Sequence, residues 1–183
     1  MDKTDRRVLK SRQAIQTTFL QMLAKDGFDE ITVRNITEKA NIGRKTFYLH
    51  YMDKYDLLDR IVDDHIAQLR EICEQKKDLG MIEGAILWFT YFEQHKSFFA
   101  ALFKSKGASS FREKLLSFTM GEINKKINED SHPIIDKRIF LKFLGTATMG
   151  VLESYVLGEI DSDIEAVATQ VVQLYKRTYL DRL

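Results

Sequence analysis

Apolar residues recur at helical spacing along almost the whole chain. Between residues 8 and 23 they fall one or two turns apart, which is the spacing of a single helix face. This stripe consists of Val8, Ile15, Phe19, Met22 and Leu23. Gly27 follows it and supplies a residue type that commonly terminates helices. The pattern predicts a first helix that ends near Asp26.

Two short helices joined by a tight turn are predicted next. The hydroxyl of Thr32 suits the N-cap of the first, which turns Val33, Ile36 and Ala40 inward. The second runs from Arg44 to about His50, and only three residues separate the two. Asn41 tolerates the left-handed backbone that such a turn needs. These features predict a helix-turn-helix unit.

Longer helices follow. Asp53 is a good N-cap, and Asp56 stands three residues later, at the capping-box position. Helical spacing then continues to about Lys77, which predicts a rod of roughly 25 residues and about 37 Å. Five more helices are expected over residues 81–95, 97–104, 109–128, 136–157 and 161–178. Because the only proline is Pro133, we predict an all-α fold of about nine helices.

Composition narrows the class of protein. With 183 residues, 44% of them hydrophobic, the chain is long enough to bury a core. One cysteine, Cys73, excludes an intramolecular disulfide, and four scattered histidines do not suggest a metal site. The first ten residues are charged, and no apolar run approaches the ~18 residues of a membrane span. We expect a cytoplasmic protein with no membrane association, metal or cofactor.

Charge is unevenly distributed. Residues 1–54 carry 11 Lys and Arg against 7 Asp and Glu, whereas the remainder carries 17 against 20. A modest basic excess of this kind is compatible with nucleic-acid binding without establishing it. Five basic residues lie near the N-terminus: Lys3, Arg6, Arg7, Lys10 and Arg12. They form either a basic arm ahead of the first helix that follows DNA, or a frayed, solvated terminus.

The segment from Thr32 to Tyr51 carries the clearest chemistry. A helix that reads duplex DNA must be short enough to enter the ~12 Å major groove and must place donors toward bases and phosphates. The two predicted helices would pack through Ile36, Ala40, Ile42 and Phe47. Polar donors would then lie on or near the exposed face of the second: Arg44, Lys45, Thr46, Tyr48 and His50.

Residues 8 to about 60 resemble the DNA-binding domain of the TetR family of bacterial regulators (TetR/AcrR type). The family has an isoleucine and an alanine ahead of a short turn, then threonine, an apolar residue, tyrosine, a basic or histidine position, an aromatic residue, and a lysine-acidic-x-leucine run. The corresponding residues are Ile36, Ala40, Asn41, Ile42, Gly43, Thr46, Phe47, Tyr48, His50, Tyr51, Lys54, Asp56 and Leu57.

The resemblance implies a homodimer on double-stranded DNA with a palindromic operator. It places phosphate contacts at Thr32, Tyr48, His50 and Lys54, and base-proximal functions at Arg44, Lys45 and Thr46. The full set of predicted DNA-contacting residues is Thr32, Arg34, Arg44, Lys45, Thr46, Tyr48, Leu49, His50 and Lys54.

Three positions are less settled. Asn41 replaces the usual turn glycine, and Lys45 stands where many members have a small residue. Whether Lys45 touches a base or a phosphate is open. Lys54 at the start of the fourth helix would face a phosphate, and the alternative is an ordinary surface lysine.

The resemblance also implies a dimerisation and effector domain after the DNA-binding domain, so we predict domains at residues 8–68 and 69–183. An effector pocket would be lined by Trp88, Phe92, His95, Phe99, Phe103 and Phe111. The alternative for each is a plain helical core. A two-fold four-helix dimer interface would use Phe143, Ala147, Gly150, Val151, Tyr155, Val171 and Tyr175. The alternative is that these residues serve only the subunit's own core.

The sequence therefore predicts a DNA-binding transcriptional regulator, a repressor released by a small-molecule effector. One alternative is a regulator of the same fold that is controlled by a protein partner, or an activator, without a small-molecule pocket. The other is an enzyme, which the absence of a nucleophile elbow, phosphate loop or HExxH motif disfavours.

Overall fold

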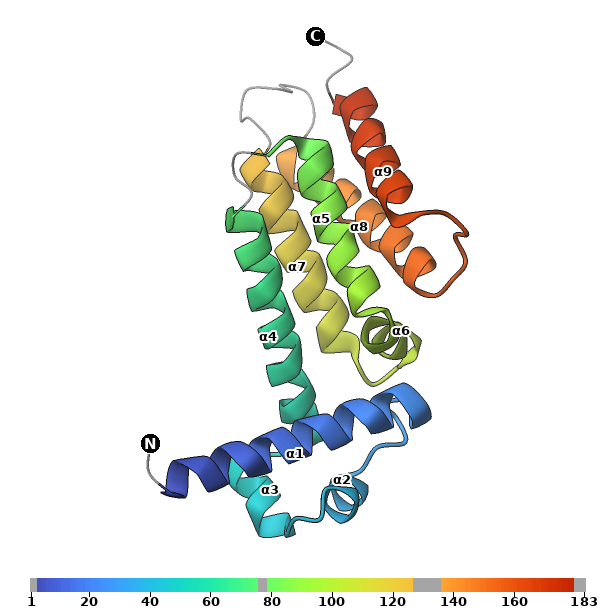
Figure 1. Ribbon diagram of the computed structural model, residues 1–183. Coiled ribbons are helices and arrows are strands. Elements are labelled where there is room, and N and C mark those ends of the chain that lie inside the picture. Colours follow the sequence, from blue (N-terminus) through green and yellow to red (C-terminus); the bar gives the residue numbers. More distant parts are fainter. Residues whose placement is uncertain (1–2, 76–78, 127–135, 180–183) are drawn as a thin grey trace. The chain divides into compact units, whose positions relative to one another are not determined.

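The computed structural model describes the backbone of residues 3–75, 79–126 and 136–179, and the side chains of residues 6–75, 79–126 and 136–177. In these residues all regular structure is helical and forms nine helices, which are labelled in Figure 1. They are α1 (Lys3–Asp26), α2 (Val33–Lys39), α3 (Arg44–His50), α4 (Lys54–Gln75), α5 (Met81–Gln94), α6 (Lys96–Lys104), α7 (Ser109–Lys126), α8 (Lys137–Val156) and α9 (Ile164–Tyr179). The predicted all-α class is confirmed. The helix ends expected at Lys77 and Asn128, and Pro133, lie outside the described residues.

The chain divides into two compact units. Unit 1 comprises Met1–His65 and Ala101–Phe111, and unit 2 comprises Ile66–Ala100 and Arg112–Leu183. Helix α4 therefore contributes residues to both. The predicted domain boundary between residues 68 and 69 stays a prediction; unit 1 also includes a segment from the middle of the chain.

Unit 1 is built around aromatic residues from α1, α3 and the segments next to them. Phe19, Phe28 and Phe47 have no exposed surface, and Tyr51 is 2% exposed. The α1 face buries four of the five residues of the predicted stripe, whereas Val8 is 49% exposed. Gly27 ends α1 with φ 78°, a left-handed conformation that glycine adopts without strain.

Unit 2 is a bundle in which α5 packs on both α8 and α9. Polar bridges support it: the Tyr91 hydroxyl donates to Gln68 on α4 at 3.2 Å, and the Arg112 guanidinium on α7 donates to Glu153 on α8 at 2.6 Å. Gly145 lets α7 approach α8, because a Cβ there would lie 2.6 Å from Cγ of Met120. The bundle thus holds α5, α7, α8 and α9 around one core.

Helix α8 is long and apolar enough to cross a membrane by length and composition, with a mean hydropathy of 1.2. In the structure 44% of that window is buried. A core helix of a helical domain has the same composition. The sequence-based statement that no such run exists was therefore too strong for this helix.

Candidate nucleic-acid interface

Helix α3 has one buried side and one open side. Phe47 is fully buried, and its ring meets Tyr51 at 5.7 Å between centroids. On the other side Tyr48 is 57% and Leu49 is 83% exposed, and Arg44 and Lys45 are exposed as well. Because Phe47 fixes the rotation of α3, the donors and the apolar Leu49 face solvent together. That surface fits the requirements for entering a groove.

The turn between α2 and α3 is held by backbone hydrogen bonds. The Ile42 amide donates to the Thr37 carbonyl at 3.0 Å, and the Ala40 amide donates to the Ile36 carbonyl at 2.8 Å. Asn41 has φ 51°, so the predicted left-handed turn residue is confirmed. This short rigid turn sets the angle between the two helices.

Helix α2 carries two further predicted contacts. The Thr32 hydroxyl accepts from the Asn35 amide at 3.2 Å and so caps α2, as predicted. Arg34 is exposed and pairs with Glu38 at 2.7 Å, one turn along. An exposed pair of this type contributes little to stability and leaves Arg34 able to exchange its partner for a phosphate.

His50 closes α3 against α1. Its Nε2 and the Ser11 hydroxyl lie within hydrogen-bonding distance, 2.7 Å apart. Burial, and secondarily the Arg12 guanidinium, lower the pKa of His50 below its ordinary value. The lowered pKa favours the neutral ring, and its contact with Ser11 ties the end of α3 to α1. Thr46, like His50, is only half-buried.

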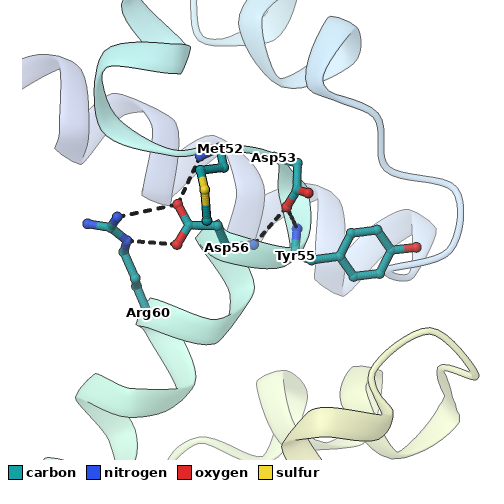
Figure 2. A network of polar contacts seen from close by, with 5 residues as sticks. All are labelled: Met52, Asp53, Tyr55, Asp56 and Arg60. Carbon is teal, nitrogen blue, oxygen red and sulfur yellow. Dashed lines mark hydrogen bonds and ion pairs between the residues drawn. The ribbon is translucent and has the colours of Figure 1, made fainter.

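A polar network fixes the start of α4 (Figure 2). Asp53 accepts from the Tyr55 and Asp56 amides at 2.8 Å each, which confirms the predicted N-cap. Asp56 accepts from the Met52 amide at 2.9 Å and from Arg60 at 3.0 Å. The Arg60 hydrogen bond, with that from Met52, lowers the pKa of the Asp56 carboxyl. The network holds the α3–α4 corner in one geometry.

Lys54 is used inside unit 1. Its ammonium donates to the carbonyls of Phe28 at 3.1 Å and Asp29 at 3.2 Å, and lies 4.6 Å from the centre of the Phe28 ring. These contacts tie the first turn of α4 to the loop after α1. The expectation that Lys54 faces a phosphate stays a prediction; in the structure its ammonium contacts this loop.

The same loop receives the segment that joins unit 1 from the middle of the chain. The Asp29 carboxylate accepts from the Gly107 amide at 3.0 Å, the Lys106 amide at 3.2 Å and the Ser105 hydroxyl at 3.1 Å. Burial alone would raise the pKa of Asp29, but these hydrogen bonds outweigh it and lower the pKa. We call this cluster, Asp29 with residues 105–107, the Asp29 clasp.

The basic residues near the N-terminus lie on α1 and not on an arm ahead of it. Helix α1 begins at Lys3, and Arg6, Arg7, Lys10 and Arg12 are exposed on it. The side chain of Lys3 is outside the described residues. Ahead of Val8 the chain has no residue of the predicted apolar stripe, so the stripe did not show that the helix begins as early as Lys3.

Unit 2 contains an apolar cavity of about 210 Å³. Its lining comes from α4, α5, α7, α8 and α9 and includes the single tryptophan, Trp88, and the single cysteine, Cys73. Of the six predicted pocket residues, Trp88 lines it. Phe92, His95 and Phe99 pack elsewhere in unit 2, with Phe92 and Phe99 ring centres 4.6 Å apart, and Phe103 and Phe111 pack together in unit 1.

The predicted lining consisted of large aromatic residues and a histidine, whereas small residues of α5 line the observed cavity beside Trp88. Gly84 and Ala85 on α5 line the cavity next to Trp88, and nothing lies within 4 Å of a Cβ built at Gly84. Small residues within an otherwise apolar helix were the available signal. Burial lowers the pKa of His95, as expected for a histidine in a helical core.

The predicted dimer residues fall into two groups. Phe143, 58% exposed, lies on the outer face of α8 with Ala147 and Gly150. Ile139, 68% exposed, lies one turn before Phe143. The other predicted residues face inward or are half-buried: Val151, Tyr155, Val171 and Tyr175.

Two of the inward residues have specific partners. The Tyr155 hydroxyl donates to Glu93 at 2.5 Å, and burial followed by this bond raises its pKa to about 12. The Tyr175 hydroxyl donates to the Leu144 carbonyl at 3.2 Å.

Among the described residues there is no group of three or more His, Cys, Asp or Glu side chains that could hold a metal ion.

Two family profiles match the chain. The profile described as bacterial regulatory proteins, tetR family, matches residues 19–61, and one described as transcriptional regulator C-terminal region matches residues 81–177. The chain belongs to the TetR family of transcriptional regulators. The profiles cover the helix-turn-helix and the helices around the cavity, respectively.

Individual relatives agree. An uncharacterised HTH-type transcriptional regulator, YxbF of Bacillus subtilis, is 44% identical over 66 residues, which are 36% of this chain and 17% of that protein. DhaS of Lactococcus lactis, the HTH-type transcriptional activator of the dhaKLM operon, is 24% identical over 93 residues, or 51% of this chain and 49% of DhaS. The chain thus matches half or less of the length of these curated relatives.

One solved structure shows the same fold over nearly the whole chain. A TetR transcriptional regulator from Streptococcus agalactiae superposes with a TM-score of 0.79 at 23% identity, covering 93% of this chain and 96% of that one.

Proposed function

We propose that this TetR-family protein is cytoplasmic, binds a palindromic DNA operator as a homodimer and represses transcription until an effector releases it. The observation that carries the proposal is the exposed face of α3. Arg44, Lys45, Tyr48 and Leu49 are exposed there, while Phe47 on the opposite side is buried and holds the helix in this orientation. Arg44 and Lys45 supply donors for guanine edges, and Tyr48 suits a phosphate oxygen. No catalytic function is proposed for the chain.

The contacts divide by function. Arg44, Lys45 and Thr46 at the start of α3 are proposed to discriminate bases. Thr32, Arg34 and Tyr48 are proposed to anchor the phosphates, with Leu49 in apolar contact. His50 and Lys54 act through position, since His50 contacts Ser11 and Lys54 contacts the loop after α1. The proposed DNA surface is therefore narrower than the full predicted set.

Dimerisation is proposed to use the outer face of α8. Exposed apolar residues on one helix face mark a protein-binding surface in an otherwise polar exterior. Ile139, Phe143, Ala147 and Gly150 provide such a face, and the two small residues permit close approach of a second copy of α8. A two-fold dimer places two copies of α3 one helical turn of DNA apart, about 34–36 Å.

Release requires an effector that binds the DNA-bound and DNA-free states with different affinity. Helix α4 contributes to both units and is the proposed connection between the cavity, which it lines through Ile72 and Cys73, and the α3–α4 corner. A second candidate function is transcriptional activation. The partial match to DhaS, named an activator, supports it.

The site assignment is tested by fluorescence anisotropy on a duplex selected by the wild-type protein from a random pool. Arg44→Ala with Tyr48→Ala should weaken binding at least ten-fold, since the lost base contact of Arg44 costs about 1–3 kcal/mol and the lost phosphate contact of Tyr48 adds to it. Arg177→Ala, a charge-matched change on α9, should leave affinity unchanged. Equal affinity of the double variant and the wild type would refute the assignment.

A further inference from the structure

The cavity in unit 2 has an apolar body and a cationic end. Its apolar lining includes Trp88, Phe89, Leu144 and Val171, which lie inside α5, α8 and α9 and not in their terminal turns at the cationic end. At that end the lining comes from helix termini: Met81 starts α5, Lys126 ends α7, and Lys176 lies in the last turn of α9. Figure 1 shows these termini at the same end of unit 2.

The hydroxyl groups that line the body are already satisfied. Thr119 donates to the Leu115 carbonyl at 2.8 Å, and Thr148 donates to the Leu144 carbonyl at 2.8 Å. Tyr175 donates to the same Leu144 carbonyl at 3.2 Å and also contacts Thr148. A ligand with polar groups along its length would find no unoccupied donor here, and its own polar groups would be desolvated without compensation. The body therefore suits an alkyl or aryl chain.

The charged lining residues are Glu122, Lys126 and Lys176. Glu122 pairs with Lys125 at 2.6 Å, and Lys125 also reaches Glu74 at 3.7 Å. Neither Lys126 nor Lys176 makes an ion pair with any carboxylate in the described part of the chain. A lysine near a helix C-terminus also complements the helix dipole, so the lysines alone do not indicate a ligand. Their position at the end of an apolar cavity does.

We propose that this cavity binds an amphipathic carboxylate, with its hydrocarbon chain against Trp88 and its carboxylate between Lys126 and Lys176. From Lys126 to Thr119 is seven residues of α7, or roughly 10 Å, which suits a medium-length chain. The inference deepens the proposed function by giving the effector a chemical class, and it rests on that function only for the effect on DNA.

Binding is measured without DNA, with decanoate as the probe. Trp88 is the only tryptophan and lines the cavity, so its fluorescence reports occupancy. Cys73 is the only cysteine and also lines it, so protection from a thiol reagent gives a second readout. Decanoate below its micellar concentration should change both signals saturably, whereas decanol should bind more weakly and decyltrimethylammonium weakest.

Three variants assign the parts of the site. Lys126→Gln with Lys176→Gln should weaken the binding of decanoate about five-fold, as expected for two partly exposed ion pairs. The affinity for decanol should stay within two-fold of the wild type. Arg177→Gln, next to Lys176 but outside the cavity lining, should change neither. Gly84→Leu fills the cavity from α5 and should abolish binding of decanoate and decanol alike. Leucine favours the helix more than glycine does, so this variant keeps its fold.

The proposal is overturned if decanoate gives no saturable signal, if decanol or the quaternary ammonium binds as tightly, or if the double lysine variant binds decanoate like the wild type. Decanoate that binds as described but leaves DNA affinity unchanged would support the ligand class and contradict the effector function. Absence of decanoate binding with intact DNA binding would contradict the ligand class and leave the proposed DNA binding untouched, so the two failures are distinguishable.

Discussion

At the scale of the residue, Arg44 and Tyr48 are proposed to do different work on the same helix face. Arg44→Ala should reduce discrimination between the selected duplex and its base-substituted versions, because a bidentate base contact carries sequence information. Tyr48→Phe should weaken binding to all duplexes by a similar factor, because a phosphate contact carries none. Anisotropy across a panel of single-base variants measures both.

Tyr55→Phe is the matched control. Tyr55 is 51% exposed, and its ring packs on Phe28 at 5.3 Å instead of standing on α3. A Tyr48→Phe protein that binds like the Tyr55→Phe protein would show that the Tyr48 hydroxyl makes no phosphate contact.

His50 predicts a pH dependence of stability. Its pKa is lowered in the folded state, so below the ordinary value of 6.5 the unfolded chain binds more protons than the folded one. The stabilisation is present above pH 6.5 and is lost as the pH falls toward the lowered pKa. The melting temperature of the wild type should fall more between pH 7.5 and 5.5 than that of His50→Gln. His95→Gln, also with a lowered pKa, separates the contribution of unit 2. Parallel profiles for wild type and His50→Gln would contradict the assignment.

Residues with short-range signals were predictable from sequence, and residues with long-range partners were not. Asn41, Thr32 and Asp53 act on backbone within four residues, so their turn and capping functions could be read from spacing. Lys54 finds its acceptors 25 and 26 residues away. No local pattern specifies such a partner, so its prediction as a phosphate ligand missed the intramolecular contacts.

At the scale of the element, the Asp29 clasp attaches residues 105–107 to the loop between α1 and α2. Asp29→Asn keeps the shape but removes the charge that strengthens its three hydrogen bonds. We expect the free energy of unfolding to fall by about 1 kcal/mol; the loss is small because the carboxylate is exposed. Thermal or urea unfolding measures this loss.

The clasp also predicts acid sensitivity. Because the folded pKa of Asp29 is lowered, its contribution is present above the ordinary value of 3.8 and is lost as the pH falls through the lowered pKa. The difference between the wild type and Asp29→Asn should therefore shrink in acid. A difference that stays constant from pH 7 to pH 3 would mean that the charge is not what stabilises the clasp. Asp26→Asn is the control, because Asp26 is exposed at the end of α1 and makes one long ion pair with Lys39, at 3.5 Å.

The helices themselves were predictable because apolar spacing and caps act within each helix. Their assembly was not. Residues 105–107 contact Asp29 more than 70 residues away in the chain, and the cavity is lined by residues of five helices, Gly84 and Ala85 of α5 among them. Both are properties of packing between distant segments.

At the scale of the whole molecule, function is proposed to require two copies of the chain. Ile139→Asp with Phe143→Asp places charges on the outer face of α8, where neither side chain is needed for the core. The variant should sediment as a monomer and bind the selected duplex at least ten-fold more weakly, since one α3 alone meets half of the operator. Lys142→Ala on the same helix is the control for a change of charge. A variant that stays dimeric would place the interface elsewhere.

If two copies of α3 read DNA about a two-fold axis, selection of bound duplexes from a random pool should enrich a palindrome whose half-site centres lie about one helical turn apart. The Arg44→Ala, Tyr48→Ala protein should enrich no such sequence. A pool without an enriched sequence, or one that the double variant enriches equally, would contradict this arrangement.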